Sequence, residues 1–105
     1  MDKLAQMSTT YDCSDAQQAL AGLRLARRAL GSGKLVVIPT DTVYGVAADA
    51  FNPAAVTRLL DAKGRGRQSP PPVLVGSPET LHALAERVTP EMESLATAFW
   101  PGGLT

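Results

Sequence analysis

Residues 34–67 read KLVVIPTDTVYGVAADAFNPAAVTRLLDAKGRGR, and this stretch decides the expected fold. Residues 34–38 form a largely apolar, β-branched run between Gly33 and Pro39, which is typical of a short strand that is buried on both faces. A polar turn follows, and residues 45–48 predict a second short strand. Two strands joined in this way place polar side chains at the end of the first one.

The same stretch continues with a helix. Asn52 is expected to be its N-cap and Pro53 its first helical residue, which is the usual order of these two residue types. The apolar spacing then extends to about Ala62. Gly64 ends the helix, because glycine adopts the left-handed conformation that closes a helical turn.

A helix is also expected before the stretch, over residues 15–30, because small and apolar residues recur there at intervals of three and four. Ser14 and Gln17 match a capping box, in which the hydroxyl of the first residue accepts the amide hydrogen of the second. Either Gly31 or Gly33 is expected to supply the left-handed residue at the end of this helix.

Beyond the stretch, the loop 64–72 is rich in Gly and Pro and excludes a helix or a central strand. Residues 73–75 predict another buried strand. Residues 77–79 and 89–91 each start a helix, with a hydroxyl cap followed by proline, and the apolar residues of both helices are expected to face inward. Residues 104–105 resemble the first residues of a strand. This alternation predicts an α/β layer with a mixed or parallel sheet.

Composition narrows the class of protein. The chain has 105 residues, 45% of them hydrophobic and 19% charged, which fits one folded domain and argues against disorder. The formal net charge is zero, but residues 58–67 carry four basic side chains and one acidic one. One cysteine, Cys13, and one histidine, His82, make a disulfide, a His-rich metal site or a Ser-His-Asp triad unexpected. We expect a cytoplasmic protein with no membrane association, since no apolar run approaches about 18 residues.

The polar turn after the first strand is the first candidate site. Thr40, Asp41, Thr42 and Tyr44 follow a strand end, where ligands bind in open α/β sheets. Their hydroxyls can donate to phosphate or carboxylate oxygens. The alternative interpretation is an ordinary turn in which Thr and Asp satisfy their own backbone.

The loop 63–67, Lys-Gly-Arg-Gly-Arg, is the second candidate site. Three cations spaced by glycine can surround an anion, with the lysine as a compact charge and the arginines as bidentate forks. The spacing is not that of a Walker loop. A solvated basic loop and a contact to an RNA backbone are the alternatives.

These pieces together resemble the YrdC-like family of threonylcarbamoyl-AMP synthases. The matching motifs are Pro39–Gly45, Lys63–Arg65, the proline-led segment Pro70–Val75 and Trp100–Thr105, so the resemblance spans residues 34–105. It implies a twisted open mixed α/β sheet flanked by helices, with a concave, positively charged cavity. Residues 1–13 would be a loose N-terminus and residues 14–105 the N-terminal part of such a domain, which we expect to be inactive alone.

The resemblance also implies a reaction. L-threonine, bicarbonate and ATP would give threonylcarbamoyl-AMP and pyrophosphate, with Mg²⁺ accompanying the ATP and no tightly bound cofactor or protein-bound metal. A partner threonylcarbamoyl transferase would then modify tRNA, and direct contact with tRNA or other double-stranded RNA is an open expectation. The alternatives are an RNA-binding module without catalysis and a carbamoyl-transfer domain like those of maturation proteins.

The roles that the resemblance implies fall on six residues. Thr42 would contact L-threonine and Tyr44 would line the cavity beside it. Lys63 and Arg65 would be catalytic and hold the ATP phosphates and the carbamate. The nucleotide would have two further contacts, Ser69 and Thr105. The run Pro70-Pro71-Pro72 departs from the pattern of relatives, which usually have fewer prolines there, and Leu74 stands where some relatives have a polar threonine contact.

Overall fold

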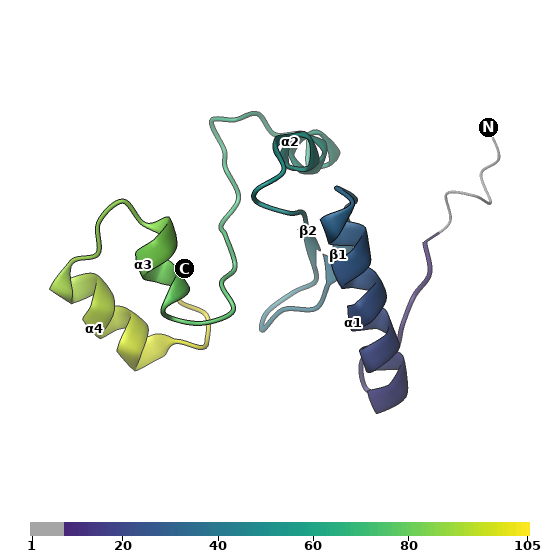
Figure 1. The fold of residues 1–105 in the computed structure, drawn as a ribbon, viewed down its shortest axis with the longest axis horizontal. Helices are drawn as coiled ribbons and strands as arrows, with labels where there is room; N and C mark the ends of the chain where they lie inside the picture. Colours follow the sequence, from purple (N-terminus) through teal and green to yellow (C-terminus); the bar gives the residue numbers. More distant parts are fainter. Residues whose placement is uncertain (1–7) are drawn as a thin grey trace. The chain divides into compact units, whose positions relative to one another are not determined.

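The computed structural model describes residues 8–105 and contains four helices and two strands in that range (Figure 1). In chain order they are α1 Ala16–Gly31, β1 Val36–Ile38, β2 Gly45–Ala47, α2 Pro53–Ala62, α3 Thr80–Leu84 and α4 Pro90–Phe99. β1 and β2 pair as a two-stranded antiparallel sheet. The described residues divide into two compact parts: one holds residues 8–36 with Val46–Leu59, and the other holds Val37–Gly45 with Leu60–Thr105.

The start of α1 differs from the capping box expected at Ser14. Asp15 is the N-cap, and its carboxylate accepts the amide hydrogens of Gln17 and Gln18 at 2.9 and 3.4 Å. Ser14 belongs to the preceding turn, where its hydroxyl and its amide donate to Oδ1 of Asp12 at 2.6 and 2.9 Å. These two hydrogen bonds, the hydroxyl one first, hold the pKa of Asp12 below its ordinary value. The expected cap at Ser14 is wrong because aspartate caps a helix as well as serine does, so the sequence pattern does not distinguish Ser14 from Asp15.

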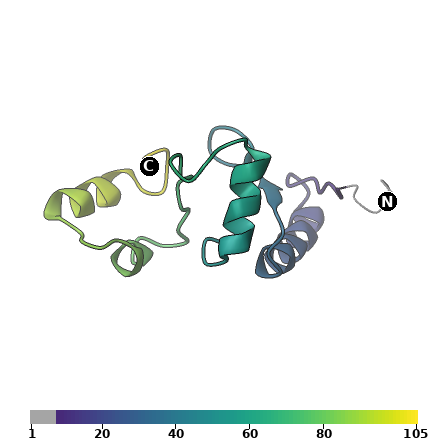
Figure 2. The ribbon, with the colours of Figure 1, turned by 90° about the horizontal axis from the view of Figure 1, so that it is seen from above.

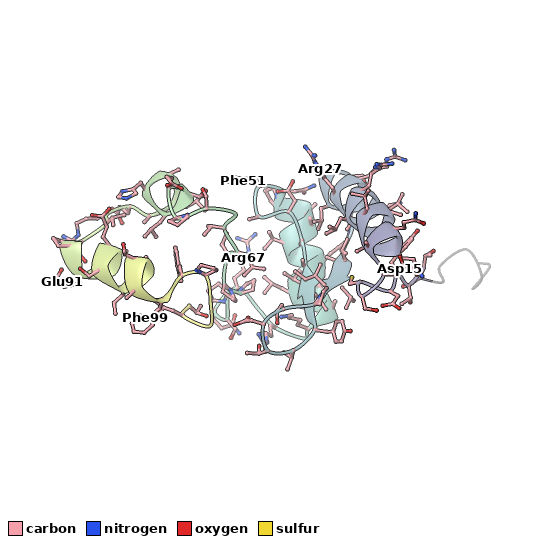
Figure 3. The ribbon with its side chains drawn as sticks, turned by 90° about the horizontal axis from the view of Figure 1, so that it is seen from below. Asp15, Arg27, Phe51, Arg67, Glu91 and Phe99 are labelled. Atoms are coloured by element: carbon pink, nitrogen blue, oxygen red, sulfur yellow. The ribbon has the colours of Figure 1, made fainter. Side chains whose placement is uncertain are left out.

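Replacing Asp15 by alanine is expected to lower the free energy of unfolding by about 1 kcal/mol, because two amides at the start of α1 lose their acceptor. Asp15 marks that end of the helix in Figure 3. Asp15→Asn keeps a side-chain oxygen and should change the stability far less. Urea unfolding followed by circular dichroism measures both variants. Ser14→Ala is the control, and a larger loss for Ser14→Ala than for Asp15→Ala would contradict the assigned cap.

α1 ends in a left-handed turn at Gly33, one of the two glycines expected there. Gly33 has a φ of +83°. Its amide donates to the carbonyl of Leu30 at 3.0 Å, and the amide of Lys34 donates to the carbonyl of Ala29 at 2.9 Å. This pair of bonds is the Schellman pattern, which satisfies carbonyls that the last helical turn leaves open. The turn sends the chain directly into β1.

α2 is tied to that turn and holds most of the buried core. The Arg58 guanidinium donates to the carbonyl of Gly33. The Asn52 side chain lies beside the same residue, since a Cβ on Gly33 would be 2.9 Å from its Nδ2. Oδ1 of Asn52 accepts the amide hydrogen of Ala55 at 3.1 Å, which confirms the expected N-cap. Four apolar side chains are buried within residues 8–105, and three of them belong to α2: Ala55, Leu59 and Leu60.

The sheet in the described range is smaller and more exposed than the sequence predicts. Val37, in the middle of β1, is 66% exposed, so the expected burial on both faces is wrong. The expected strands at residues 73–75 and 104–105 do not form. A strand requires a partner that supplies backbone donors and acceptors, and an apolar run does not provide one. The α/β order of the elements at the front of the chain is confirmed.

The helices after the basic loop start close to the expected places. The hydroxyl of Thr89 accepts the amide hydrogen of Met92 at 3.2 Å, and Pro90 is the first residue of α4. α3 is shorter than expected. Figures 1 and 2 show α3 and α4 as successive helices joined by a loop, and Nε2 of His82 lies 3.0 Å from Oε1 of Glu93 across that pair.

Apolar side chains remain exposed on α1, on α4 and on α3, where Leu84 is 43% exposed although inward placement was expected. Ala96 of α4 is buried as expected, but Leu95 and Phe99 are 48% and 59% exposed, so their expected inward placement is wrong. On α1, Leu23 is 67% exposed. Within the described residues, none of the helices has the length and apolar character needed to cross a bilayer. The expected loose terminus, residues 1–13, falls mostly outside the described range, although Tyr11 contacts α1 at Gly22.

Candidate functional site

The six residues that the sequence singles out lie in one compact part of the chain, formed by Val37–Gly45 with Leu60–Thr105. All six side chains are exposed to solvent: Thr42, Tyr44, Lys63, Arg65, Ser69 and Thr105. They come from three places, namely the turn between β1 and β2, the loop after α2 and the turn after α4. Each place is held by its own local hydrogen bonds.

The turn between β1 and β2 is organised by a single hydroxyl. Oγ1 of Thr40 accepts the amide hydrogens of Thr42 at 3.3 Å and Val43 at 3.1 Å, and it donates to the carbonyl of Val43. Side-chain bonds of this kind replace the ladder bonds that a turn lacks. The interpretation of this segment as a turn that satisfies its own backbone is therefore correct for Thr40.

Two other hydroxyls of this turn are available to a ligand. The amide of Thr42 donates a hydrogen bond to Thr40, but its hydroxyl makes none within residues 8–105. The hydroxyl therefore keeps its donor and both of its acceptor positions for a ligand. The Tyr44 side chain is 77% exposed, and its hydroxyl has no partner within the same residues. A hydroxyl held on an ordered turn and not used by the protein suits recognition of a small polar substrate.

The basic loop begins as the C-terminal cap of α2. Gly64, with a φ of +64°, donates its amide hydrogen to the carbonyl of Asp61 at 3.1 Å. The amide of Arg65 donates to the carbonyl of Leu60 at 2.9 Å, which completes a second Schellman motif. Lys63 is the cap residue of this motif. The backbone of both predicted cations is thus fixed by the end of the helix, while their side chains extend into solvent.

The cations of the loop have no acidic partner in the described part of the chain, where the one contact of this kind joins Nε2 of His82 to Oε1 of Glu93. Lys63, Arg65 and Arg67 are all exposed, and Figure 3 shows Arg67 on the segment that follows α2. Unpaired cations concentrated in five residues attract anions, and the arginines offer forks that match phosphate and carboxylate groups.

The turn after α4 is held by an aromatic side chain whose part the sequence did not reveal. Nε1 of Trp100 donates to the carbonyl of Leu104 at 2.9 Å. A Cβ on Gly102 would lie 2.8 Å from the carbonyl oxygen of Phe99, so glycine is required there. A Cβ on Gly103 would lie 3.5 Å from Oδ2 of Asp41. Trp100 is half-buried. In the sequence, the dipeptide Gly102-Gly103 was the only signal that the backbone of this turn lies close to other atoms of the chain.

The structure therefore brings the turn after α4 against the hydroxyl-rich turn, at Asp41. Within residues 8–105, no hydrogen bond joins the side chain of Lys63 or Arg65 to Thr42. Two surface hollows lie along and beside α4, and neither is lined by any of the six residues. No three His, Cys, Asp or Glu side chains of the described range come together as metal ligands.

The chain matches the family model Sua5/yciO/yrdC, which carries the description "Telomere recombination", over residues 28–105. It is 49% identical over 102 residues to a Mycobacterium leprae protein provisionally named threonylcarbamoyl-AMP synthase, a match that covers 97% of this chain and 46% of the relative. A Pyrococcus abyssi protein named threonylcarbamoyl-AMP synthase is 45% identical over 83 residues, covering 79% of this chain and 24% of the relative.

A solved structure of a doubly substituted Pyrococcus abyssi Sua5 has the same fold over most of this chain. The TM-score is 0.73 at 44% sequence identity, and the match covers 76% of this chain and 24% of that one. The chain thus spans about half the length, or less, of these relatives. The range matched by the family model, residues 28–105, contains all six predicted site residues.

Proposed function

Because this chain belongs to the Sua5/YciO/YrdC family, we propose that it supplies the threonine- and phosphate-binding groups of an L-threonylcarbamoyladenylate synthase. One observation carries the proposal: an unused hydroxyl at Thr42 and unpaired cations at Lys63 and Arg65 belong to the same compact part of the chain. The family membership suggests the substrate class, the resemblance suggests the residues, and their exposure in one part of the chain supports the proposal.

The proposed reaction has two steps. The amine of L-threonine adds to bicarbonate with loss of water, which gives a carbamate. An oxygen of this carbamate attacks the α-phosphorus of ATP, the bond to the bridging oxygen of the β-phosphate breaks, and pyrophosphate leaves. The second step brings two anions together, so fixed positive charge is needed where the negative charge accumulates. No covalent bond to the protein forms.

The proposed roles of the six residues are those that the resemblance assigns. Thr42 contacts the L-threonine substrate with its free hydroxyl, and Tyr44 lines the same side of the site. Lys63 and Arg65 bind the phosphates and the carbamate, and their main chain is held by the cap of α2. Ser69 and Thr105 contact the nucleotide. Mg²⁺ enters with ATP as part of the substrate.

The product requires a second enzyme. A threonylcarbamoyl transferase would consume threonylcarbamoyl-AMP and modify an adenosine of tRNA in the cytoplasm. The exposed cations of the basic loop also favour a second candidate, direct binding of RNA through its phosphates. That candidate predicts an affinity that falls steeply with salt and that survives loss of the Thr42 hydroxyl.

The test uses a chimera in which this whole chain takes the place of the segment that it matches in the Pyrococcus abyssi protein, assayed beside the unaltered parent. We expect pyrophosphate release that requires L-threonine, bicarbonate and ATP together, and threonylcarbamoyl-AMP as the product seen by mass spectrometry. Carbamoyl phosphate should not replace L-threonine with bicarbonate.

Three outcomes would contradict the proposal. A folded chimera that releases no pyrophosphate while its parent is active would reject the synthase. Product formed from carbamoyl phosphate would favour a carbamoyl-transfer domain. Salt-dependent RNA binding without adenylation, unchanged in Thr42→Val, would favour an RNA-binding module. A circular dichroism spectrum and a cooperative melt of the chimera establish that it is folded before these outcomes are compared.

A further inference from the structure

We propose that Thr40 is a positioning residue that presents Thr42 to the amino acid substrate and makes no contact with the substrate itself. The inference rests on the proposed function and goes beyond it, because the family resemblance assigns a substrate contact to Thr42 and gives Thr40 no role. The hydrogen bonds of the turn distinguish them.

The hydroxyl of Thr40 has no bonding capacity left for a ligand. A threonine hydroxyl offers one donor and two acceptor positions. In this turn both acceptor positions are taken by the amides of Thr42 and Val43, at 3.3 and 3.1 Å, and the donor is directed to the carbonyl of Val43. A substrate atom could bond Thr40 only by displacing one of these contacts.

Thr42 has the opposite arrangement. Its backbone amide is fixed by Thr40, two residues earlier, and its hydroxyl is unused within residues 8–105. The bond therefore restrains the main chain at the residue whose side chain is free. Without the bond, the turn would explore several conformations, and substrate binding would bear the cost of selecting one of them.

The location of the turn separates this role from a contribution to the core. Thr40 is exposed, and its neighbours Val43 and Tyr44 are 72% and 77% exposed. An exposed turn opens locally without unfolding the protein. Loss of the Thr40 hydroxyl should thus loosen the presentation of Thr42 and leave the melting temperature almost unchanged.

The kinetic test compares Thr40→Val, which removes the hydroxyl at nearly constant volume, with Thr40→Ser, which keeps it. In the chimera, Thr40→Val should raise KM for L-threonine about tenfold, since two or three net hydrogen bonds of the turn are lost, while KM for ATP changes less than about twofold. Thr40→Ser should restore KM for L-threonine to within about twofold of the unaltered chimera.

A second measurement uses this chain itself and does not depend on any activity. Amide hydrogen exchange, measured by NMR in the whole 105-residue chain, should accelerate at Thr42 and Val43 in Thr40→Val by about fivefold or more and recover in Thr40→Ser. Unchanged exchange at both amides would overturn the proposed hydrogen bonds. Faster exchange with an unchanged KM for L-threonine would overturn the positioning role. An inactive chimera whose Thr40→Val exchange still rises would reject the proposed function and leave the bonds of the turn supported.

Discussion

Arg65→Ala is expected to lower turnover in the chimera at least about a hundredfold, and Lys63→Ala to have an effect of similar size. Both cations are exposed, have no acidic partner in the described range and are held at the cap of α2. They would offset the repulsion between the carbamate and the phosphates, which is largest in the transition state. Steady-state rates of pyrophosphate release measure the effect, which should fall mainly on kcat.

The same loop provides the matched control. Arg67 is a third exposed cation, two residues beyond Arg65, and it has no assigned role. Arg67→Ala should change turnover only a few-fold, as expected for a general contribution to the local field. Arg65→Lys should be intermediate, because it keeps the charge and loses the bidentate fork. Full activity in both Lys63→Ala and Arg65→Ala would reject the assigned roles. An equal loss of turnover in these two variants and in Arg67→Ala would indicate a diffuse effect of charge.

Gly33→Ala is expected to lower the free energy of unfolding by about 2–3 kcal/mol, the largest effect on stability that we predict. The left-handed φ of +83° disfavours any side chain at this residue. The new Cβ would also lie 2.9 Å from Nδ2 of Asn52, the side chain that caps α2. One methyl group would thus strain the end of α1 and also disturb the side-chain cap of α2. Denaturant unfolding of the 105-residue chain measures the difference.

Gly31→Ala is the matched control for this change. Gly31 is the last residue of α1, and a Cβ on it would meet nothing within 4 Å. Alanine should be neutral there or stabilise the chain by up to about 1 kcal/mol, because it has the higher helix propensity. A loss of stability in Gly31→Ala as large as that in Gly33→Ala would contradict the assignment of the turn to Gly33.

The parts of the fold that local chemistry dictates could be predicted from the sequence. Asn52 with Pro53, and Thr89 with Pro90, begin helices because a side-chain acceptor followed by proline satisfies the first turn. Gly64 ends a helix because the Schellman turn needs a left-handed residue. In each case the decisive contacts lie within a few residues of one another.

The parts that depend on distant partners could not be predicted. Residues 73–75 are apolar and follow a proline-rich loop, yet Leu74 is 72% exposed and pairs with no strand in the described range. The apolar composition of such a segment favours burial, but it does not tell whether a neighbouring strand is present to pair with its backbone. The approach of Gly103 to Asp41 is of the same kind, because it joins residues about sixty positions apart.

The residue types of the candidate site could be read from the sequence, and the roles assigned to the six residues stay predictions. The cations of the loop and the free hydroxyl of Thr42 agree with the chemistry expected from the sequence. Thr40 and Trp100 turned out to use their polar groups on the main chain of their own turns. Sequence spacing cannot distinguish a hydroxyl that binds a substrate from one that holds a turn, because both occur in the same motif.

A crystal structure of the chimera with L-threonine and a non-hydrolysable ATP analogue tests the central claim most directly. The account predicts the hydroxyl of Thr42 within hydrogen-bond distance of the amino acid, and the side chains of Lys63 and Arg65 on the phosphates of the same bound pair. Ligands bound elsewhere, or Thr42 and the two cations on opposite surfaces of the molecule, would contradict it.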